Sequence, residues 1–522
     1  MERNWAPRHW PESRLTGVTL IAAALMLAAP LWSVWAPAMP DYPAHLASFA
    51  LIQQGTGNKF YHLHWAFVPN LASEVLVPLL ARLTGLVVAA KLFLTAAIFL
   101  WVLGPGAVHR ALYGRTGIAP LFGSFFAYNA NFVWGFFNYY FSAGLSFAIF
   151  AAWIATDKRN GVPRLAGFTL AVTLLYFCHV FAAGSLLLML AGFEVSQNFR
   201  LEHHDPRALA RRAARVAVLY IPAGLAFLFL KPQGKGDNAV IFDLSGTMPD
   251  RFESLVQHAF GDGAYVLPIA LFAGLGLALT MRKARLHPAM WGTLGLLLIG
   301  AIFAPEWAFG GWAVHLRLPA VFGAMLFASA ELPMKPATRT ALVALVLVTI
   351  GWCAVTLAQS WLVYDRQFRE FQAALEEVPR GARMLTVLDG DAIGDRPDQP
   401  YWHMAEFAVP ERGVFTPLLF TTRGQHVVQL NPPYVKYAAA SAQQGSPPDV
   451  DELGFLARGQ MDRDQDIRDD MPYLNHFQCH FDIAVVVHLD GKRTPVPPML
   501  RLRHAGTFFS FYDILPDRSC KP

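Results

Sequence analysis

A single aspartate after the first long apolar run has the chemistry best suited to catalysis. Asp41 lies at the end of that run, and Pro40 and Pro43 restrict the backbone on both sides of it. Partial desolvation raises the basicity of a carboxylate, so a rigidly held aspartate at a membrane boundary suits a general base or a metal ligand. Aspartate is also favoured at helix starts, and Asp41 could simply cap the following helix. His45, one helical turn later, could assist Asp41 or pack at an interface.

The segment from residue 128 to residue 140 combines aromatic rings with three asparagines. Aromatic residues commonly form a belt at the membrane interface, which accounts for most of this segment. The amides are different, because an amide in lipid needs hydrogen-bonding partners. Rings and amides together also make a site for a carbohydrate or an isoprenoid chain.

Three cations next to apolar runs could bind a phosphate. Arg317 lies at the start of one run, where a planar guanidinium can bind phosphate through two hydrogen bonds. Lys231 and Lys235 lie just after another run and could add contacts. The alternative for all three is that they extend to lipid headgroups at the interface.

Membrane-spanning helices must position these residues. Charged residues make up 15% of the 522 residues, against about 25% in soluble proteins, and hydrophobic residues make up 54%. The mean hydropathy is +0.34. A soluble fold cannot bury so much apolar surface, so we expect a polytopic α-helical membrane protein with about 11 transmembrane helices. The predicted spans lie near residues 17–36, 86–106, 117–132, 138–156, 164–179, 181–198, 216–230, 264–280, 289–304, 318–333 and 340–361.

Basic residues predict the orientation. With the N-terminus inside, the inner segments hold 18 lysines and arginines and the outer segments hold 7. An odd number of spans then places the C-terminal tail on the outer side of the bacterial inner membrane, in the periplasm. All the candidate residues fall on the outer face. The net charge of +5 therefore follows membrane orientation, and we expect no nucleic-acid partner.

The chain divides into a transmembrane domain, residues 1–361, and a small soluble domain, residues 362–522. The first outer loop, residues 37–85, is too long for a hairpin and predicts helices on the membrane surface over 46–53 and 71–83. The tail predicts a helix over 368–378 and strands over 384–388, 414–420 and 483–488, which is an α/β or α+β fold. Cys479 and Cys520 could pair if the tail lies outside.

Several common kinds of chemistry have no motif in this chain. It lacks GxxxxGK[ST], GxSxG, HExxH and paired CxxC patterns. Acidic residues are almost absent from the predicted spans, which argues against a proton-coupled transporter. The spacing of Cys, His and acidic residues defines no metal site.

The run Pro40–Ala47, the segment 132–139 and the loop from Trp312 to Arg317 resemble a group of bacterial membrane proteins with the plan of GT-C glycosyltransferases. The resemblance covers residues 15–380 and rests on architecture. It implies transfer of a hexose or pentose from a polyprenyl-phosphate carrier to a lipid or glycan acceptor on the outer face of the bacterial inner membrane.

The resemblance also implies roles for particular residues. Asp41 matches the first-loop acid and would be the catalytic base, and Arg317 with Lys231 and Lys235 would bind the phosphate. Acceptor or sugar contacts would come from His45, His64, Asn131 and Trp134. Members of the class often carry a second acid, but Tyr42 follows Asp41 here, so a divalent metal cofactor is doubtful. Two alternatives remain: a transporter or lipid-moving protein, and a non-enzymatic envelope assembly or sensor protein.

Overall fold

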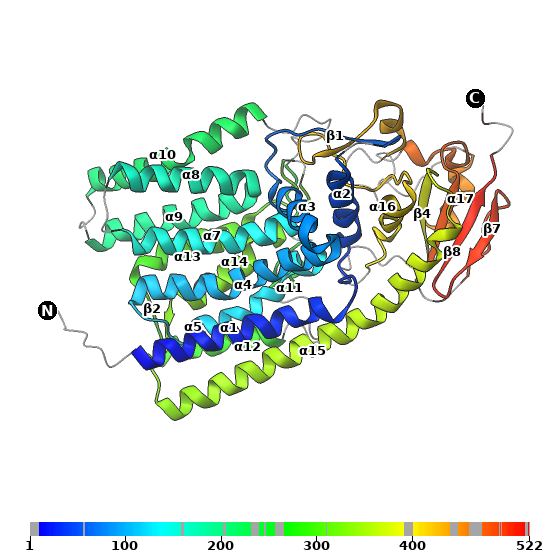
Figure 1. The fold of residues 1–522 in the computed structure, drawn as a ribbon. Coiled ribbons are helices and arrows are strands. Elements are labelled where there is room, and N and C mark those ends of the chain that lie inside the picture. Colours follow the sequence, from blue (N-terminus) through cyan, green and yellow to red (C-terminus); the bar gives the residue numbers. More distant parts are fainter. Residues whose placement is uncertain are drawn as a thin grey trace.

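The structure is a computed structural model that describes residues 10–55, 58–157, 161–201, 205–230, 240–244, 247–255, 266–309, 311–390, 400–438, 447–458, 472–489, 491, 493–516 and 520. Apolar helices run side by side through most of the molecule, and a small sheet lies at the end opposite the N-terminus (Figure 1). This is the arrangement that we expect of a multi-pass membrane protein with a small α+β lobe.

Ten helices coincide with ten of the predicted spans. Lipid offers no hydrogen-bond partners to the backbone, so these apolar segments form helices, in which the backbone N–H and C=O groups pair with one another. Six of them (α1, α4, α7, α9, α10 and α15) are long and apolar enough to cross a membrane, and four are shorter, so the number of crossings stays a prediction. The ten are α1 (Trp10–Ser33), α4 (Leu86–Tyr113), α7 (Phe137–Ala155), α8 (Val162–Cys178), α9 (Val180–Leu201), α10 (Pro206–Leu230), α12 (Val266–Thr280), α13 (Trp291–Phe303), α14 (Leu318–Ala328) and α15 (Pro336–Ala374).

The predicted span over 117–132 is not one helix. It consists of α5 (Ala119–Gly123), the 3₁₀ helix η1 (Ser124–Tyr128) and α6 (Ala130–Trp134). The side chain of Asn129 accepts a hydrogen bond from the backbone N–H of Asn131 and starts α6, which ends at Gly135 in the left-handed conformation. These local signals interrupt the apolar run and turn the chain toward the first loop.

The first outer loop holds two helices, and only one of them has an exposed apolar face. In α2 (Tyr42–Gln54), every residue from Tyr42 to Ile52 is buried. The prediction of a surface helix is therefore wrong for α2, because the C-terminal part of the chain covers it. The second helix, α3 (Ala72–Thr84), buries Glu74 and Val77 and exposes Leu79 and Leu83 on the other side.

The part of the chain after α15, which we call the C-terminal lobe, contains a four-stranded sheet. Its order is β4 (Met384–Asp389), β6 (Ile483–His488), β8 (Phe509–Ile514) and β7 (Leu500–Ala505). β4 pairs parallel with β6, and the other two pairings are antiparallel. Phe371 of α15 packs on Phe509 and Phe511 of β8, so the end of α15 covers one face of the sheet.

Two predictions for the lobe need revision. The strand predicted over 414–420 forms only a single bridge, between Phe415 and Arg383, because Pro417 lacks an N–H and the apolar residues bury individually. The helix predicted over 368–378 consists of the end of α15, to Ala374, and the 3₁₀ helix η5 (Leu375–Glu377), and α15 passes residue 361 without a break. Cys479 and Cys520, which could pair according to the sequence, form a disulfide.

The lobe is also joined to the first loop. β1 (Tyr61–Leu63) pairs antiparallel with β5 (Val428–Leu430), and the hydroxyl of Tyr61 accepts a hydrogen bond from the N–H of Thr416 at 3.0 Å. Two short segments, η6 (Met404–Phe407) and α16 (Ala408–Arg412), lie against α2. In Figure 1, α2, α3 and α16 occupy the region between the helix bundle and the sheet.

Candidate active site

Asp41 is the N-cap residue of α2, immediately before Tyr42, but its side chain makes no capping hydrogen bond. The backbone fixes it from two directions: its N–H donates to the carbonyl of Trp134 at 3.0 Å, and its carbonyl accepts from the N–H of His45 at 3.0 Å. Gly135 lies directly behind it, where an added Cβ would come 3.4 Å from the Cβ of Asp41. The carboxylate is therefore held rigidly and stays available for other chemistry.

Two lobe residues that the sequence analysis did not identify lie beside Asp41. His403 Nε2 is 3.9 Å from Asp41 Oδ1, and His403 Nδ1 is 3.7 Å from Glu406 Oε1. Glu406 is fully buried, and neither of its carboxylate oxygens has a hydrogen-bond partner. The site thus contains two carboxylates with one imidazole between them.

The surroundings of Asp41 bring its pKa into the range of a general base. Burial raises the pKa of Asp41 to about 7, although the nearby charges of His403 and Arg317 lower it. Burial lowers the pKa of His403, but Glu406 and Asp41 outweigh burial and the pKa of His403 is raised overall. Asp41 can therefore gain and lose a proton near neutral pH, beside a histidine that favours its charged form.

Arg317, at the start of α14, is a buried cation close enough for its charge to lower the pKa of Asp41. It contacts His179 Nε2 at 3.3 Å and donates to the carbonyl of Trp312 at 3.1 Å, while its Nε has no hydrogen-bond partner. Within the described ranges it forms no ion pair with a carboxylate. Three rings surround its guanidinium at 4.7–5.3 Å: those of Phe136, Tyr139 and Phe181.

Aromatic rings and one amide lie near these charged groups. Trp134 makes edge contacts with Trp312, at 5.1 Å between ring centroids, and with Trp402 of the lobe, at 6.5 Å. Asn131 donates to the carbonyl of Leu316 at 3.1 Å, and its own buried Oδ1 has no partner. An amide oxygen and tryptophan rings are groups that bind a sugar.

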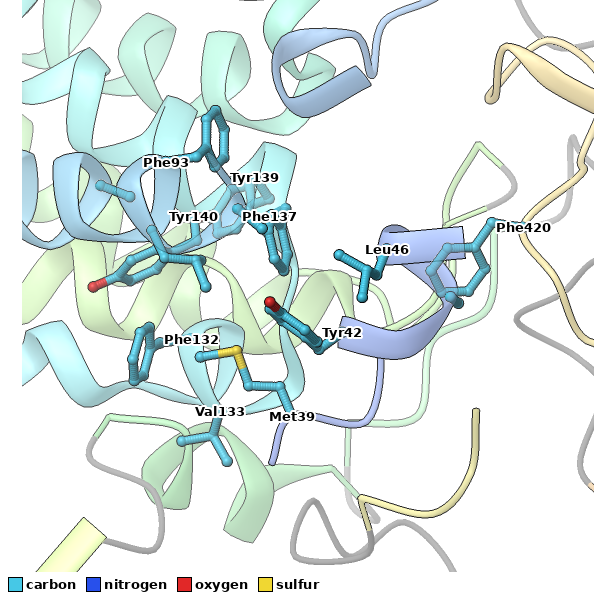
Figure 2. Close-up of a cluster of buried hydrophobic side chains, with 14 of the residues drawn as sticks. Met39, Tyr42, Leu46, Phe93, Phe132, Val133, Phe137, Tyr139, Tyr140 and Phe420 are labelled. Carbon is cyan, nitrogen blue, oxygen red and sulfur yellow. The ribbon is translucent and has the colours of Figure 1, made fainter. Parts of the chain in front are cut away.

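His45, one helical turn after Asp41, packs among aromatic rings. Its ring contacts Phe49, Phe137 and Phe420 at 4.7–5.8 Å between centroids. Burial, together with the histidines at 403 and 426, lowers the pKa of His45 to about 3, so it is neutral. Figure 2 shows the neighbouring apolar cluster: Met39 and Tyr42 lie near Phe132, Val133 and Phe137, and Phe420 lies at α2, away from them.

The other predicted residues fall elsewhere or cannot be placed. His64 is exposed at the end of β1, where its N–H donates to the carbonyl of Val427 at 2.8 Å. Lys231 and Lys235 lie outside the described residues. Among the residues that the structure does describe, no group of three or more His, Cys, Asp or Glu is arranged to hold a metal ion.

A second polar cluster in the lobe has a structural role. His488 Nδ1 lies 2.6 Å from Asp389 Oδ2, and His488 Nε2 lies 3.1 Å from Ser510 Oγ. Serine hydrolases also arrange an aspartate, a histidine and a serine in a row, but their serine must be accessible to substrate. Ser510 has no exposed surface, so the cluster connects three strands and presents no nucleophile.

Comparison with known proteins gives a general likeness. No family model matches the chain, and no curated protein is significantly similar to it. Two crystal structures of ArnT from Cupriavidus metallidurans are similar, each at 11% identity. The apo structure has a TM-score of 0.48 over 96% of this chain and 98% of that one. The structure bound to undecaprenyl phosphate has a TM-score of 0.45 over 99% and 100%. ArnT is a GT-C glycosyltransferase, the class that the sequence resembles. At this identity and with these TM-scores, the likeness carries no argument about activity.

Proposed function

We propose that this protein is a membrane glycosyltransferase that moves a sugar from a polyprenyl-phosphate carrier to a lipid or glycan acceptor on the outer face of the bacterial inner membrane. One observation carries the proposal. A carboxylate with a pKa of about 7 and a buried guanidinium lie within electrostatic range of each other, and neither has a hydrogen-bonded ion pair within the described residues. Burying an uncompensated cation is costly, and an anionic ligand offsets that cost.

The proposed reaction needs a base and a group that stabilises the leaving phosphate. Asp41 removes the proton from an acceptor hydroxyl as its oxygen forms a bond to the anomeric carbon. The bond from that carbon to the phosphate oxygen breaks, and the electron pair stays on the polyprenyl phosphate. Arg317 stabilises this phosphate through its guanidinium donors. In this proposal, Trp134, Trp312 and Asn131 hold the sugar.

The location of the site supports an outer-face reaction. Asp41 follows the end of α1 that is remote from the N-terminus, and the lobe lies on the same side (Figure 1). The Cys479–Cys520 disulfide supports an oxidising compartment for that lobe, because disulfides are rare in the cytosol. The basic residues favour the same orientation.

The test is release of polyprenyl phosphate by the full-length protein in lipid nanodiscs, with short-chain polyprenyl-phosphate hexoses and pentoses as donors. We expect Asp41→Asn to lower kcat by about 10²–10⁴-fold, because it removes the base. We expect Arg317→Lys to lower kcat by roughly 10²-fold, because one point charge replaces a planar set of donors.

Arg251→Lys is the matched control. Arg251 is also a buried arginine, but it donates to the carbonyls of Ala301 and Ala304. The control should alter thermal stability and leave release unchanged. If Asp41→Asn retains full release, the catalytic assignment is wrong. If function survives Asp41→Ala but is lost when residues 365–522 are deleted, a non-enzymatic role is favoured. Lipid movement that tolerates Asp41→Asn would indicate a transporter.

A further inference from the structure

The buried carboxylate of Glu406 has no role in the reaction described above. It lies on η6 in the lobe, with no exposed surface and no hydrogen-bond partner for either oxygen. A buried carboxylate in this state is strongly unfavourable unless a positive charge lies close to it. The nearest candidate in the described structure is His403, whose Nδ1 is 3.7 Å away.

The ring of His403 is oriented toward both carboxylates. Nδ1 faces Glu406, and Nε2 faces Asp41 at 3.9 Å. Phe420 packs edge-on against the ring at 5.0 Å, and the imidazole is almost completely buried, so its orientation is fixed. An imidazolium here would present one N–H to each carboxylate, which a neutral imidazole cannot do.

We propose that His403 and Glu406 are positioning residues through which the C-terminal lobe favours the ionised form of Asp41. Glu406 stabilises the charged form of His403, and that charge in turn favours the carboxylate form of Asp41. The importance of this effect for catalysis rests on the proposed function. The effect itself is a property of the folded protein and needs no substrate.

The charges around Asp41 agree with this arrangement. Glu406 and Asp41 raise the pKa of His403 against the effect of burial, and His403 lowers that of Asp41. The other titratable or charged groups that face this cluster come from α2, α14, β1 and the lobe: His45, Arg317, Tyr61 and His426. Of these, His45 is neutral and Arg317 acts in the same direction as His403, so Asp41 titrates as part of a coupled group.

The lobe also provides a matched control. His426 packs against the same ring, Phe420, at 5.5 Å, and its Nδ1 is 3.1 Å from Glu74. It is therefore a second buried histidine–glutamate pair in the same interface. Its carboxylate partner is on α3, and Asp41 is not among the groups it contacts.

The experiment is an infrared titration of the full-length protein in nanodiscs without substrate. The carboxyl band of Asp41 is identified by its loss in Asp41→Asn. We expect His403→Gln to raise the titration midpoint of Asp41 by about one pH unit, which is a tenfold smaller ionised fraction below the midpoint. Glu406→Gln should shift the midpoint in the same direction by less, His403→Lys should restore most of it, and His426→Gln should leave it unchanged.

The outcomes separate this inference from the proposed function. If neither His403→Gln nor Glu406→Gln moves the midpoint, or if His426→Gln moves it equally, the inference is overturned. Glu406→Gln keeps the shape of the side chain and serves as the decisive variant if His403→Gln does not fold. If the midpoint moves as expected but no donor is consumed in any assay, the inference stands and the transferase assignment falls.

Discussion

Asp41 and His45 lie one turn apart on the same helix, yet their surroundings give them opposite properties. The rings around His45 supply no charge partner, and burial therefore keeps it neutral. Asp41 is only partly exposed and desolvation raises its pKa, but the charges of His403 and Arg317 limit that rise. Desolvation therefore keeps His45 neutral and out of acid–base chemistry, whereas it brings the pKa of Asp41 close to neutral pH. The sequence alone does not reveal this difference between two residues that could both act as a base.

The pKa of Asp41 predicts the pH dependence of the reaction. Only the ionised carboxylate can accept a proton, so kcat/KM should rise with pH and level off above a pKa of about 7. Between one pH unit below and one above that value, we expect a change of about tenfold. Steady-state rates across this range measure it. A profile that stays flat through neutral pH would contradict the assignment of Asp41 as the base.

At the level of elements, Gly135 determines where Asp41 lies. It ends α6 with φ of +86°, and its Cα faces Met39 and Asp41. A Cβ at this position would come 3.1 Å from the Cβ of Met39, closer than most packed side chains allow. The break in the apolar run therefore brings the backbone of α6 against the start of α2.

We predict that Gly135→Ala impairs transfer more than stability explains. Alanine costs about 1–2 kcal/mol in the left-handed conformation, and the added methyl group must also displace Asp41. A misplacement on the order of 1 Å can cost 10²-fold in rate. Gly114→Ala is the control, since Gly114 has φ of +72° and no heavy atom within 4 Å of an added Cβ. Equal activity of the two variants at equal thermal stability would contradict this prediction.

Sequence reasoning found the parts of the site that residue type reveals. Asp41 between prolines and Arg317 beside an apolar run are unusual enough to identify, and the structure brings them within electrostatic range. His403 and Glu406 are ordinary polar residues of the tail, and only tertiary packing places them beside Asp41. No local pattern could have indicated that contact.

The same limit applies to secondary structure. The strands at Met384 and Ile483 were predictable from their apolar runs. β7, with its exposed arginines, was not, because a half-exposed edge strand has little hydrophobic signal. The burial of α2 could not be predicted either, since it depends on the lobe that covers it.

At the scale of the whole molecule, the site lies where three parts of the chain meet. The first loop supplies Asp41, the bundle supplies Arg317, and the lobe supplies His403. The lobe and the first loop are held together by the β1–β5 pairing and by Glu74, which accepts from the N–H of Val427 at 3.1 Å. The stability of the lobe therefore affects the site directly.

The disulfide gives a test of lobe stability. Replacing Cys479 and Cys520 by serine should lower the free energy of unfolding by about 4 kcal/mol for a loop of this length, because the two residues are 41 positions apart. Thermal unfolding with and without reductant measures the effect. Cys178 and Cys353 are free, so the corresponding serine variants should respond to reductant as the wild type does. Insensitivity of the wild type to reductant would contradict the prediction.

The uninterrupted course of α15 restricts how the protein can open. Its 39 residues form a rod about 58 Å long, with one end in the bundle and the other under the sheet. Asp365, in the last third of this rod, accepts from the backbone N–H of Trp35 at 2.5 Å and fixes α15 to the exit of α1. The lobe consequently has no pivot along this connection. Under the proposed function, a long-chain lipid would therefore reach Asp41 by a sideways path between helices and not through a swinging cap.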